Sequence, residues 1–249
     1  MKISNAELLR YSKQIILKKI GILGQKRIFS TKVLVVGVGG LGCPLALYLA
    51  NTGIGIIGLI DNDKVDISNL NRQILFNSKD VGKYKVVQAK KFLNKTNKKI
   101  KIKIYTDRLA EKNIKKILNK YDIICDCSDN FATRYLLNNF CFKNKKILIS
   151  AAISKFSAHI FNFDFSKNIP CYECFMPEAP DAENKCDSEG ILPAVAGIAG
   201  SLQASEVIKS ILGKKNELVG KMIIFNTFNL NFRKVKLTKN SNCLCCAKK

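Results

Sequence analysis

An uncharged segment with glycine at fixed spacing constrains this chain most. Residues 33–61 fit a strand, a glycine turn, a helix and a second strand that ends in Asp61. Gly37, Gly39 and Gly42 form the pattern G-x-G-x-x-G. The first glycine permits a tight turn, the second lets the backbone approach a phosphate, and the third lets the helix pack against the strand. Because a carboxylate after the second strand can accept hydrogen bonds from ribose hydroxyls, the segment predicts a nucleotide site.

The same segment has the hydropathy of a transmembrane helix, since residues 33–60 contain no charge. Glycines and Pro44 interrupt it at turn-like intervals, and a buried strand–helix–strand unit has the same hydropathy. We therefore expect no membrane span and no membrane partner. Residues 1–7 lack the apolar core of a signal peptide, so the sequence predicts a cytoplasmic protein.

The chain has 249 residues, of which 47% are hydrophobic, and a formal net charge of +23. This length is sufficient for one large α/β domain. The positive charge comes mostly from scattered lysines rather than from clustered arginines and aromatic residues, so we expect no specific nucleic-acid binding. The densest basic run, residues 95–103, alternates lysine with isoleucine and predicts a half-exposed strand. We expect the positive charge to attract the protein to acidic surfaces, including that of an acidic protein partner.

Strand-like and helix-like patterns alternate along the first part of the chain. Strands are expected at 32–36, before Asp61, and at 100–105, 121–125 and 147–150, with helices ending near 51 and at 83–94, 113–119 and 134–142. An N-terminal helical region, 6–29, is expected to break near Gly21 and Gly24. Short strands at 159–165, 222–226 and 233–237 bracket a polar loop, 177–190, and a helix, 192–212. This order predicts an α/β fold with a Rossmann-like, doubly wound, mostly parallel sheet that antiparallel strands extend.

Polar residues follow the predicted strands at the edge where their carboxyl ends meet. Carboxylates stand at Asp61, Asp63 and Asp129, and cations at Arg72 and Lys85. Alone, each would be an ordinary helix cap or a solvated surface charge. Together at one sheet edge they suit a polyphosphate with a magnesium ion.

Two cysteine pairs have the spacing of a zinc site. Cys171-x-x-Cys174 and Cys243-x-x-Cys246 are two arms of a Cys₄ set, so we expect a closed, structural zinc site that ties the C-terminal tail to the start of the long loop. Without a secretory signal a disulfide framework is not expected. Four reduced thiols without metal are the alternative. Cys245 is not expected to be a zinc ligand.

Ordered motifs over nearly the whole chain resemble the ubiquitin-activating E1-like family of adenylyltransferases that includes ThiF, MoeB and HesA. The matching stretches are residues 10–14, 37–42, 61–63, 68–76, 81–85, 126–130, 171–174 and 200–206. The resemblance implies a single adenylation domain, 1–249, with a nucleotide-binding half at about 31–150 and a carrier-binding and zinc half at about 151–249.

The resemblance also implies a reaction. The C-terminal glycine carboxylate of a ubiquitin-like sulfur carrier ending in Gly-Gly (MoaD- or ThiS-type) attacks the α-phosphate of ATP, which gives an acyl-adenylate and pyrophosphate for molybdopterin or thiamine biosynthesis. A carboxylate is already ionised near neutral pH and needs no general base. This agrees with a chain whose only histidine, His159, is expected to be a strand residue.

Residue roles follow from the same resemblance. Asp129 is expected to hold Mg²⁺, Asp61 the ribose, and Arg72 and Lys85 the phosphates. The other residues expected to bind the nucleotide are Gly37, Gly39, Gly40, Gly42, Asp63, Asn69 and Gln73.

Two residues have open roles. Lys13 stands where the family usually has an arginine that reaches the phosphates from the other subunit of a homodimer, and lysine keeps the charge but loses the bidentate fork. Cys186 corresponds to a cysteine that can bind the activated carrier covalently in the thiamine-type branch, and an inert loop thiol is the alternative. No sulfurtransferase motif follows Cys246, so we expect an external sulfur donor.

Two other functions compete with adenylation. An NAD-dependent oxidoreductase would explain the glycine pattern but not Arg72, Lys85 and Asp129. A non-catalytic, zinc-bearing scaffold for a ubiquitin-like protein would not need the phosphate-site residues.

Overall fold

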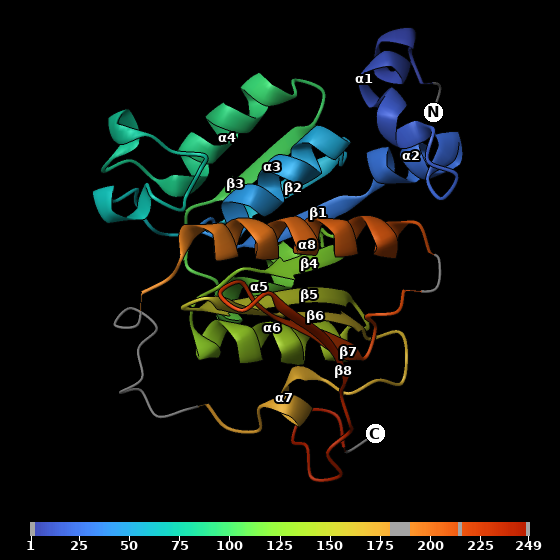
Figure 1. Ribbon diagram of the computed structural model, residues 1–249, viewed down its shortest axis with the longest axis vertical. Helices are drawn as coiled ribbons and strands as arrows, with labels where there is room; N and C mark the ends of the chain where they lie inside the picture. Colours follow the sequence, from blue (N-terminus) through green and yellow to red (C-terminus); the bar gives the residue numbers. More distant parts are fainter. Residues whose placement is uncertain (1–2, 180–189, 214–215, 248–249) are drawn as a thin grey trace.

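One eight-stranded sheet organises the residues that the computed structural model describes, which are 3–179, 190–213 and 216–247. Its order is β3-β2-β1-β4-β5-β6-β7-β8 (Figure 1). The strands are β1 (Lys32–Val36), β2 (Ile56–Ile60), β3 (Lys101–Tyr105), β4 (Ile123–Asp126), β5 (Ile147–Ser154), β6 (Ser157–Asp164), β7 (Lys221–Asn226) and β8 (Asn231–Lys236).

The sheet changes from parallel to antiparallel at β5. Strands β1 to β5 pair in parallel, which requires crossover connections. Strand β5 instead turns directly into β6 through Lys155, whose φ of 50° lies in the left-handed region. Strands β6, β7 and β8 continue the antiparallel part. The predicted fold class, a mostly parallel sheet extended by antiparallel strands, is therefore confirmed.

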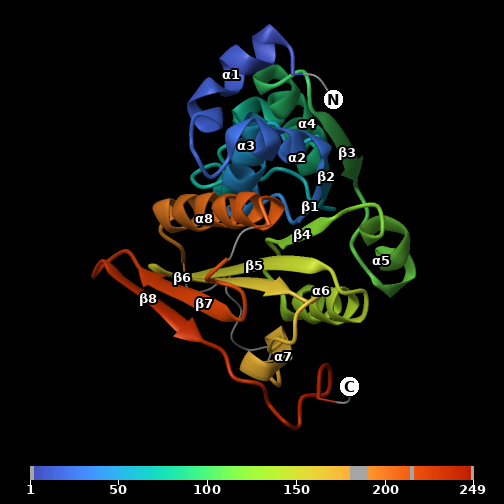
Figure 2. The ribbon, with the colours of Figure 1, turned by 90° about the vertical axis from the view of Figure 1, so that its right-hand side faces the viewer.

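Helices cover both faces of the sheet. Helices α3, α4 and α8 lie on one face, and α5 and α6 lie on the other (Figures 1 and 2). The helices are α1 (Asn5–Ile15), α2 (Gly21–Ser30), α3 (Gly42–Thr52), α4 (Lys85–Thr96), α5 (Glu111–Leu118), α6 (Phe131–Lys143), α7 (Tyr172–Phe175) and α8 (Pro193–Ile211), with short 3₁₀ turns at Ile67–Asn69 and Ser78–Asp80.

After Lys32, strand β1 is apolar at every position because both faces of the sheet are covered. Val33 and Val35 belong to the hydrophobic core on the side of α3, whereas Leu34 and Val36 belong to the core on the opposite side. Because side chains alternate along a strand and both faces are covered, the strand reads as a continuous apolar run.

The uncharged segment after Lys32 is the unit β1–α3–β2, as predicted, rather than a membrane helix. Among the described residues, none of the helices combines the length and the apolar character that crossing a membrane requires.

Some local expectations are wrong. The N-terminal helical region is interrupted at residues 16–20, next to Gly21 as expected, but the expected break at Gly24 is wrong because Gly24 lies inside α2. Gly24 is a packing position, because an added Cβ would lie 2.7 Å from Leu212 Cδ2. Helix α7 was not predicted, and most of the polar loop 177–190 lies outside the described residues.

A glycine sets the distance between α3 and α8. A Cβ on Gly200 would lie 2.5 Å from the Leu41 carbonyl oxygen and 2.6 Å from Pro44 Cγ, whereas a Cβ on Gly197 would meet nothing within 4 Å. The two glycines lie on the same helix, but only Gly200 faces a backbone that cannot move aside.

We predict that Gly200→Ala lowers the free energy of unfolding by about 1–3 kcal/mol, because it overpacks the contact between α3 and α8. The matched change Gly197→Ala should leave it unchanged or raise it by up to about 1 kcal/mol, since alanine is the better helix former. Urea denaturation of both variants measures the difference, and equal stabilities would contradict this packing.

Candidate active site

The glycine turn between β1 and α3 has the geometry that its sequence predicts. Gly37 has a φ of 88°, and a Cβ there would lie 2.7 Å from the Cys127 carbonyl oxygen. A Cβ on Gly42 would lie 2.0 Å from the Gly37 carbonyl oxygen, so helix α3 can begin this close to β1 only with glycine. A Cβ on Gly39 would have Gln73 Nε2 as its nearest neighbour, at 3.8 Å, so there is room for a ligand against the Gly39 backbone.

Asp61 follows β2 and supports this turn. Its Oδ2 accepts a hydrogen bond from the Val38 N–H at 2.7 Å, and its Oδ1 accepts one from the Asp63 N–H at 2.8 Å. Burial raises the pKa of the Asp61 carboxyl above its ordinary value, and the two N–H groups partly oppose that shift. Each carboxylate oxygen has a second lone pair, so the predicted contact with a ribose remains available.

The predicted cations Lys85 and Arg72 both line the cavity at this edge. Lys85 opens α4, and its Nζ lies 2.9 Å from Oδ2 of Asp63, with the lysine side chain only 7% exposed. The Nη1 of Arg72 donates to the Ser68 carbonyl at 3.1 Å and to Asn71 Oδ1 at 3.0 Å. Arg72 is thus bound to neutral oxygens, and its charge is available to an anion.

Gln73 provides an independent sign that a ligand belongs here. Its side chain lines the cavity and is 3% exposed. Its Oε1 is buried and has no hydrogen-bond partner among the described residues. Since an unsatisfied buried oxygen is costly, a bound donor at this position would be favourable.

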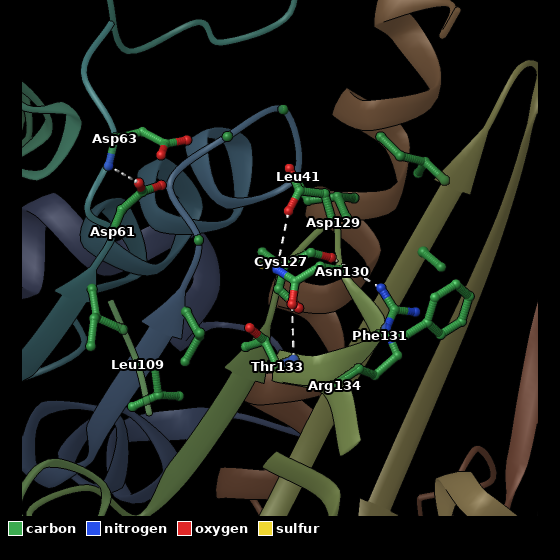
Figure 3. Close-up of a pocket in the computed structure, with 18 of the residues that line it drawn as sticks. Leu41, Asp61, Asp63, Leu109, Cys127, Asp129, Asn130, Phe131, Thr133 and Arg134 are labelled. Atoms are coloured by element: carbon green, nitrogen blue, oxygen red, sulfur yellow. Dashed lines mark hydrogen bonds between the residues drawn. The ribbon is translucent and has the colours of Figure 1, made fainter. Parts of the chain in front are cut away.

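The loop after β4 carries two aspartates with different roles. Asp126 is fully buried and accepts hydrogen bonds from the hydroxyls of Ser128 and Ser150, each at 2.6 Å. Asp129 is exposed on the cavity side, and its Oδ1 accepts a hydrogen bond from Asn130 Nδ2 at 3.3 Å. Asn130 caps α6 by accepting from the Thr133 N–H (Figure 3). Of the two carboxylates, only Asp129 is open to a metal ion, while Asp126 stabilises the loop.

These groups surround one cavity of about 620 Å³ at the carboxyl ends of the central strands. That volume is typical of a small-molecule site. The predicted residues that line it are Gly37, Gly39, Gly40, Asp61, Asp63, Arg72, Gln73, Lys85 and Asp129.

Among the described residues, three that were predicted for the nucleotide site or for catalysis do not line this cavity. Gly42 acts through helix packing, and Asn69 lies in the first 3₁₀ turn. Lys13 is exposed on α1, so within one chain it makes no contribution to the cavity wall described here. Cys186 lies outside the described residues.

The cavity continues into a second half that sequence reasoning did not anticipate. Aromatic and apolar side chains from β6, α7 and the residue after α7 form part of its wall: His159, Phe161, Tyr172, Phe175 and Met176. The rings of Phe161 and Phe175 lie 5.3 Å apart. Burial lowers the pKa of His159, and the charge of Arg134 adds to that effect, so the neutral imidazole is favoured. This is the strand residue that the sequence predicted, in the wall of the cavity.

The two cysteine pairs come together outside the lining of this cavity. The sulfur atoms of Cys171, Cys174, Cys243 and Cys246 all lie within 4.8 Å of one another. Four convergent thiols at such distances fit a tetrahedral zinc ion. Cys245 lies outside this group, and its sulfur accepts a hydrogen bond from Asn138.

The sheet, the glycine turn and the charged edge define a Rossmann-type nucleotide-binding site. The ThiF family model matches residues 11–245, and the chain belongs to the ThiF family.

Curated relatives of known name extend along the whole chain. It is 42% identical over 249 residues to "Adenylyltransferase and sulfurtransferase MOCS3" of Culex quinquefasciatus, and 40% identical over 250 residues to the protein of the same name from Drosophila willistoni. These alignments cover 99% of this chain but only 57% and 55% of the two relatives. The chain therefore spans a little over half the length of these relatives.

Solved structures show the same architecture. The crystal structure of E. coli MccB with MccA-N7isoASN has a TM-score of 0.85 at 25% identity, over 99% of this chain and 76% of that chain. The crystal structure of E. coli MccB with ATP has a TM-score of 0.84 at 27% identity, over 95% and 74%. The predicted E1-like family is thereby confirmed.

We predict that the purified protein holds one zinc ion per chain and that Cys243→Ser removes it. Loss of the metal frees the tail, so the melting temperature should fall by about 5 °C or more, at about 2–4 °C per kcal/mol for a chain of this size. Elemental analysis and calorimetry measure both quantities. The neighbouring change Cys245→Ser is the control and should keep the metal; zinc retained in Cys243→Ser would refute this ligand set.

Proposed function

We propose that this protein is an ATP-dependent adenylyltransferase that activates the C-terminal glycine of a ubiquitin-like sulfur carrier. The observation that carries the proposal is the single cavity in which a phosphate-binding edge continues into an aromatic wall. One half suits a nucleotide triphosphate, and the other suits an extended peptide end. The reaction joins a carboxylate to an α-phosphate, so the two sites must meet.

The chemistry demands alignment and charge neutralisation rather than proton transfer. Arg72 and Lys85 would hold the phosphates, and Lys85 keeps donors to spare beside Asp63. Asp129 would hold Mg²⁺, which would offset the charge between the two anions. Asp61 would bind the ribose, and the open backbone at Gly39 would lie against a phosphate. His159 lies next to the Phe175 ring, and the reaction requires no base because the attacking carboxylate is already ionised.

The names of the relatives support this proposal. The MOCS3 proteins are named as both adenylyltransferases and sulfurtransferases, and this chain covers 57% of the first of them. One of the similar MccB structures was solved together with ATP. We therefore place the carrier in molybdopterin biosynthesis or in a related thiamine-type pathway, with sulfur supplied by an external donor. A covalent role of Cys186 and a cytoplasmic location remain predictions.

The alternatives fit the cavity less well. A nicotinamide-dependent oxidoreductase would leave the cations Arg72 and Lys85 and the exposed carboxylate of Asp129 without a function. A zinc-bearing scaffold without turnover would not need the buried, unsatisfied oxygen of Gln73.

We further propose a homodimer that forms through α1 and α2. These helices lie at one end of the molecule (Figure 1). Together with the segment that joins them, they expose several large apolar side chains: Leu9, Ile16, Leu17, Ile22 and Leu23. Exposed apolar surface of this kind favours association. Lys13 is exposed on the same α1 helix, where it could reach the phosphates of the partner subunit.

We predict that the protein releases pyrophosphate when mixed with ATP, Mg²⁺ and a ubiquitin-like sulfur carrier that ends in Gly-Gly. Arg72→Ala should slow release by about 100-fold or more, because it removes a charged donor to the phosphates. Arg233→Ala is the control, because Arg233 lies on β8 and is not among the residues that line the cavity. Near-normal pyrophosphate release by Arg72→Ala would refute the site assignment. No pyrophosphate release by the wild type would refute the proposed function.

For the dimer, light scattering should give twice the chain mass of 27.8 kDa. Leu9→Glu should shift the protein to monomers, because it places charge in the apolar interface. Leu9 is 79% exposed, and the equally exposed Leu230 (80%) on the β7–β8 turn provides the control Leu230→Glu, which should remain dimeric. A monomeric wild type would exclude a role of Lys13 in a partner subunit.

A further inference from the structure

Arg134 lies where the two halves of the cavity meet. It is in the first turn of α6, is 6% exposed, and lines the cavity together with Asp129 of the polar half and Tyr172 of the aromatic half. Figure 3 shows its guanidinium pointing toward the loop that carries Asp129 and Asn130. Because a buried charge is stable only with partners, its contacts indicate what it holds in place.

Its first contacts join the loop after β4 to the middle of β5. The Nη2 of Arg134 donates to the Ser128 carbonyl at 3.0 Å and to the Ala151 carbonyl at 3.3 Å, and its Nε lies 3.6 Å from Asp126 Oδ2. Ser128 directly precedes Asp129 in the chain. The guanidinium therefore fixes the backbone from which the candidate magnesium ligand projects, relative to β5.

Its other contact reaches the aromatic half. The guanidinium carbon lies 5.6 Å from the centre of the Tyr172 ring, within the range of a cation–π interaction. Tyr172 opens α7, which also supplies Phe175 to the cavity wall. The N–H of Tyr172 donates to Asn138 Oδ1 at 2.9 Å, so α6 holds α7 at a second point.

We infer that Arg134 is a positioning residue for adenylation: it holds Asp129 and the aromatic wall in one fixed relation, so that the metal-bound phosphate and the incoming carboxylate meet. This inference rests on the proposed function. Only arginine suits the position, because its planar fork can serve two carbonyls, a carboxylate and an aromatic face together. The single ammonium of lysine cannot.

The test is Arg134→Lys in the full chain, with ATP binding followed by calorimetry at increasing Mg²⁺ concentrations and no carrier present. The affinity for ATP without Mg²⁺ should stay unchanged. The Mg²⁺ concentration that gives half of the maximal increase in ATP affinity should rise by about 10-fold or more, as expected when a group that orients a metal ligand is removed. With carrier present, kcat for pyrophosphate release should fall while KM for ATP stays the same.

The matched control is Arg27→Lys. Arg27 on α2 also donates to a backbone carbonyl, that of Leu212 at 3.0 Å, but it does not line the cavity. It tests whether the loss of any arginine bond to a backbone carbonyl is sufficient, and it should keep the wild-type magnesium dependence. If Arg134→Lys does not fold, Asp126→Asn breaks the same ion pair from the other side and should shift the magnesium dependence in the same direction.

The inference would be overturned if the folded Arg134→Lys protein had the magnesium dependence of the wild type. If Asp126→Asn is used in its place, the same result there would overturn it. The same shift in Arg27→Lys would overturn it too, because it would show that the effect does not depend on contact with the cavity. The proposed function has a separate test: it fails if the wild type with carrier releases no pyrophosphate. The magnesium titration needs no carrier, so its result does not depend on that test.

Discussion

The parallel pairing of β1 with β2 on one side and β4 on the other is the constraint on which the site depends. This register places Val36 beside Ile60 and beside Asp126, so the three strands end at one edge. The strand order reverses between β1 and β4, and a crevice opens at such a reversal. The glycine turn, Asp61 and Asp129 meet there although they lie far apart in the sequence (Figure 3).

The charges at this edge are arranged so that the site stays stable while it keeps its attraction for anions. The buried cations Lys85 and Arg134 each have a carboxylate neighbour, Asp63 and Asp126 respectively. An unpaired charge at these positions would cost several kcal/mol. Arg72, which is less buried, is bound to neutral oxygens and keeps its full charge for a ligand. The same edge can therefore stay folded without ligand and still neutralise a polyphosphate.

Features that depend on local chemistry could be predicted from the sequence. Glycine spacing predicted the β1–α3 turn, short apolar runs between helix-like segments predicted the parallel strands, and cysteine spacing predicted the four convergent thiols. Features that depend on distant packing could not. Asp126 and Asp129 lie in one short stretch, and only the contacts with Ser150 and Arg134 reveal which is buried. Arg134 itself looked like an ordinary helix residue, and Gly24 looked like a helix break until its contact with Leu212 was known.

A crystal structure with a non-hydrolysable ATP analogue and Mg²⁺ tests the central claim most directly. Our account predicts phosphates between the backbone at Gly39 and the cations Arg72 and Lys85, a metal ion on Asp129, and an α-phosphate that faces the aromatic wall. An empty crevice under saturating nucleotide, or a nicotinamide dinucleotide bound there in preference to ATP, would contradict it.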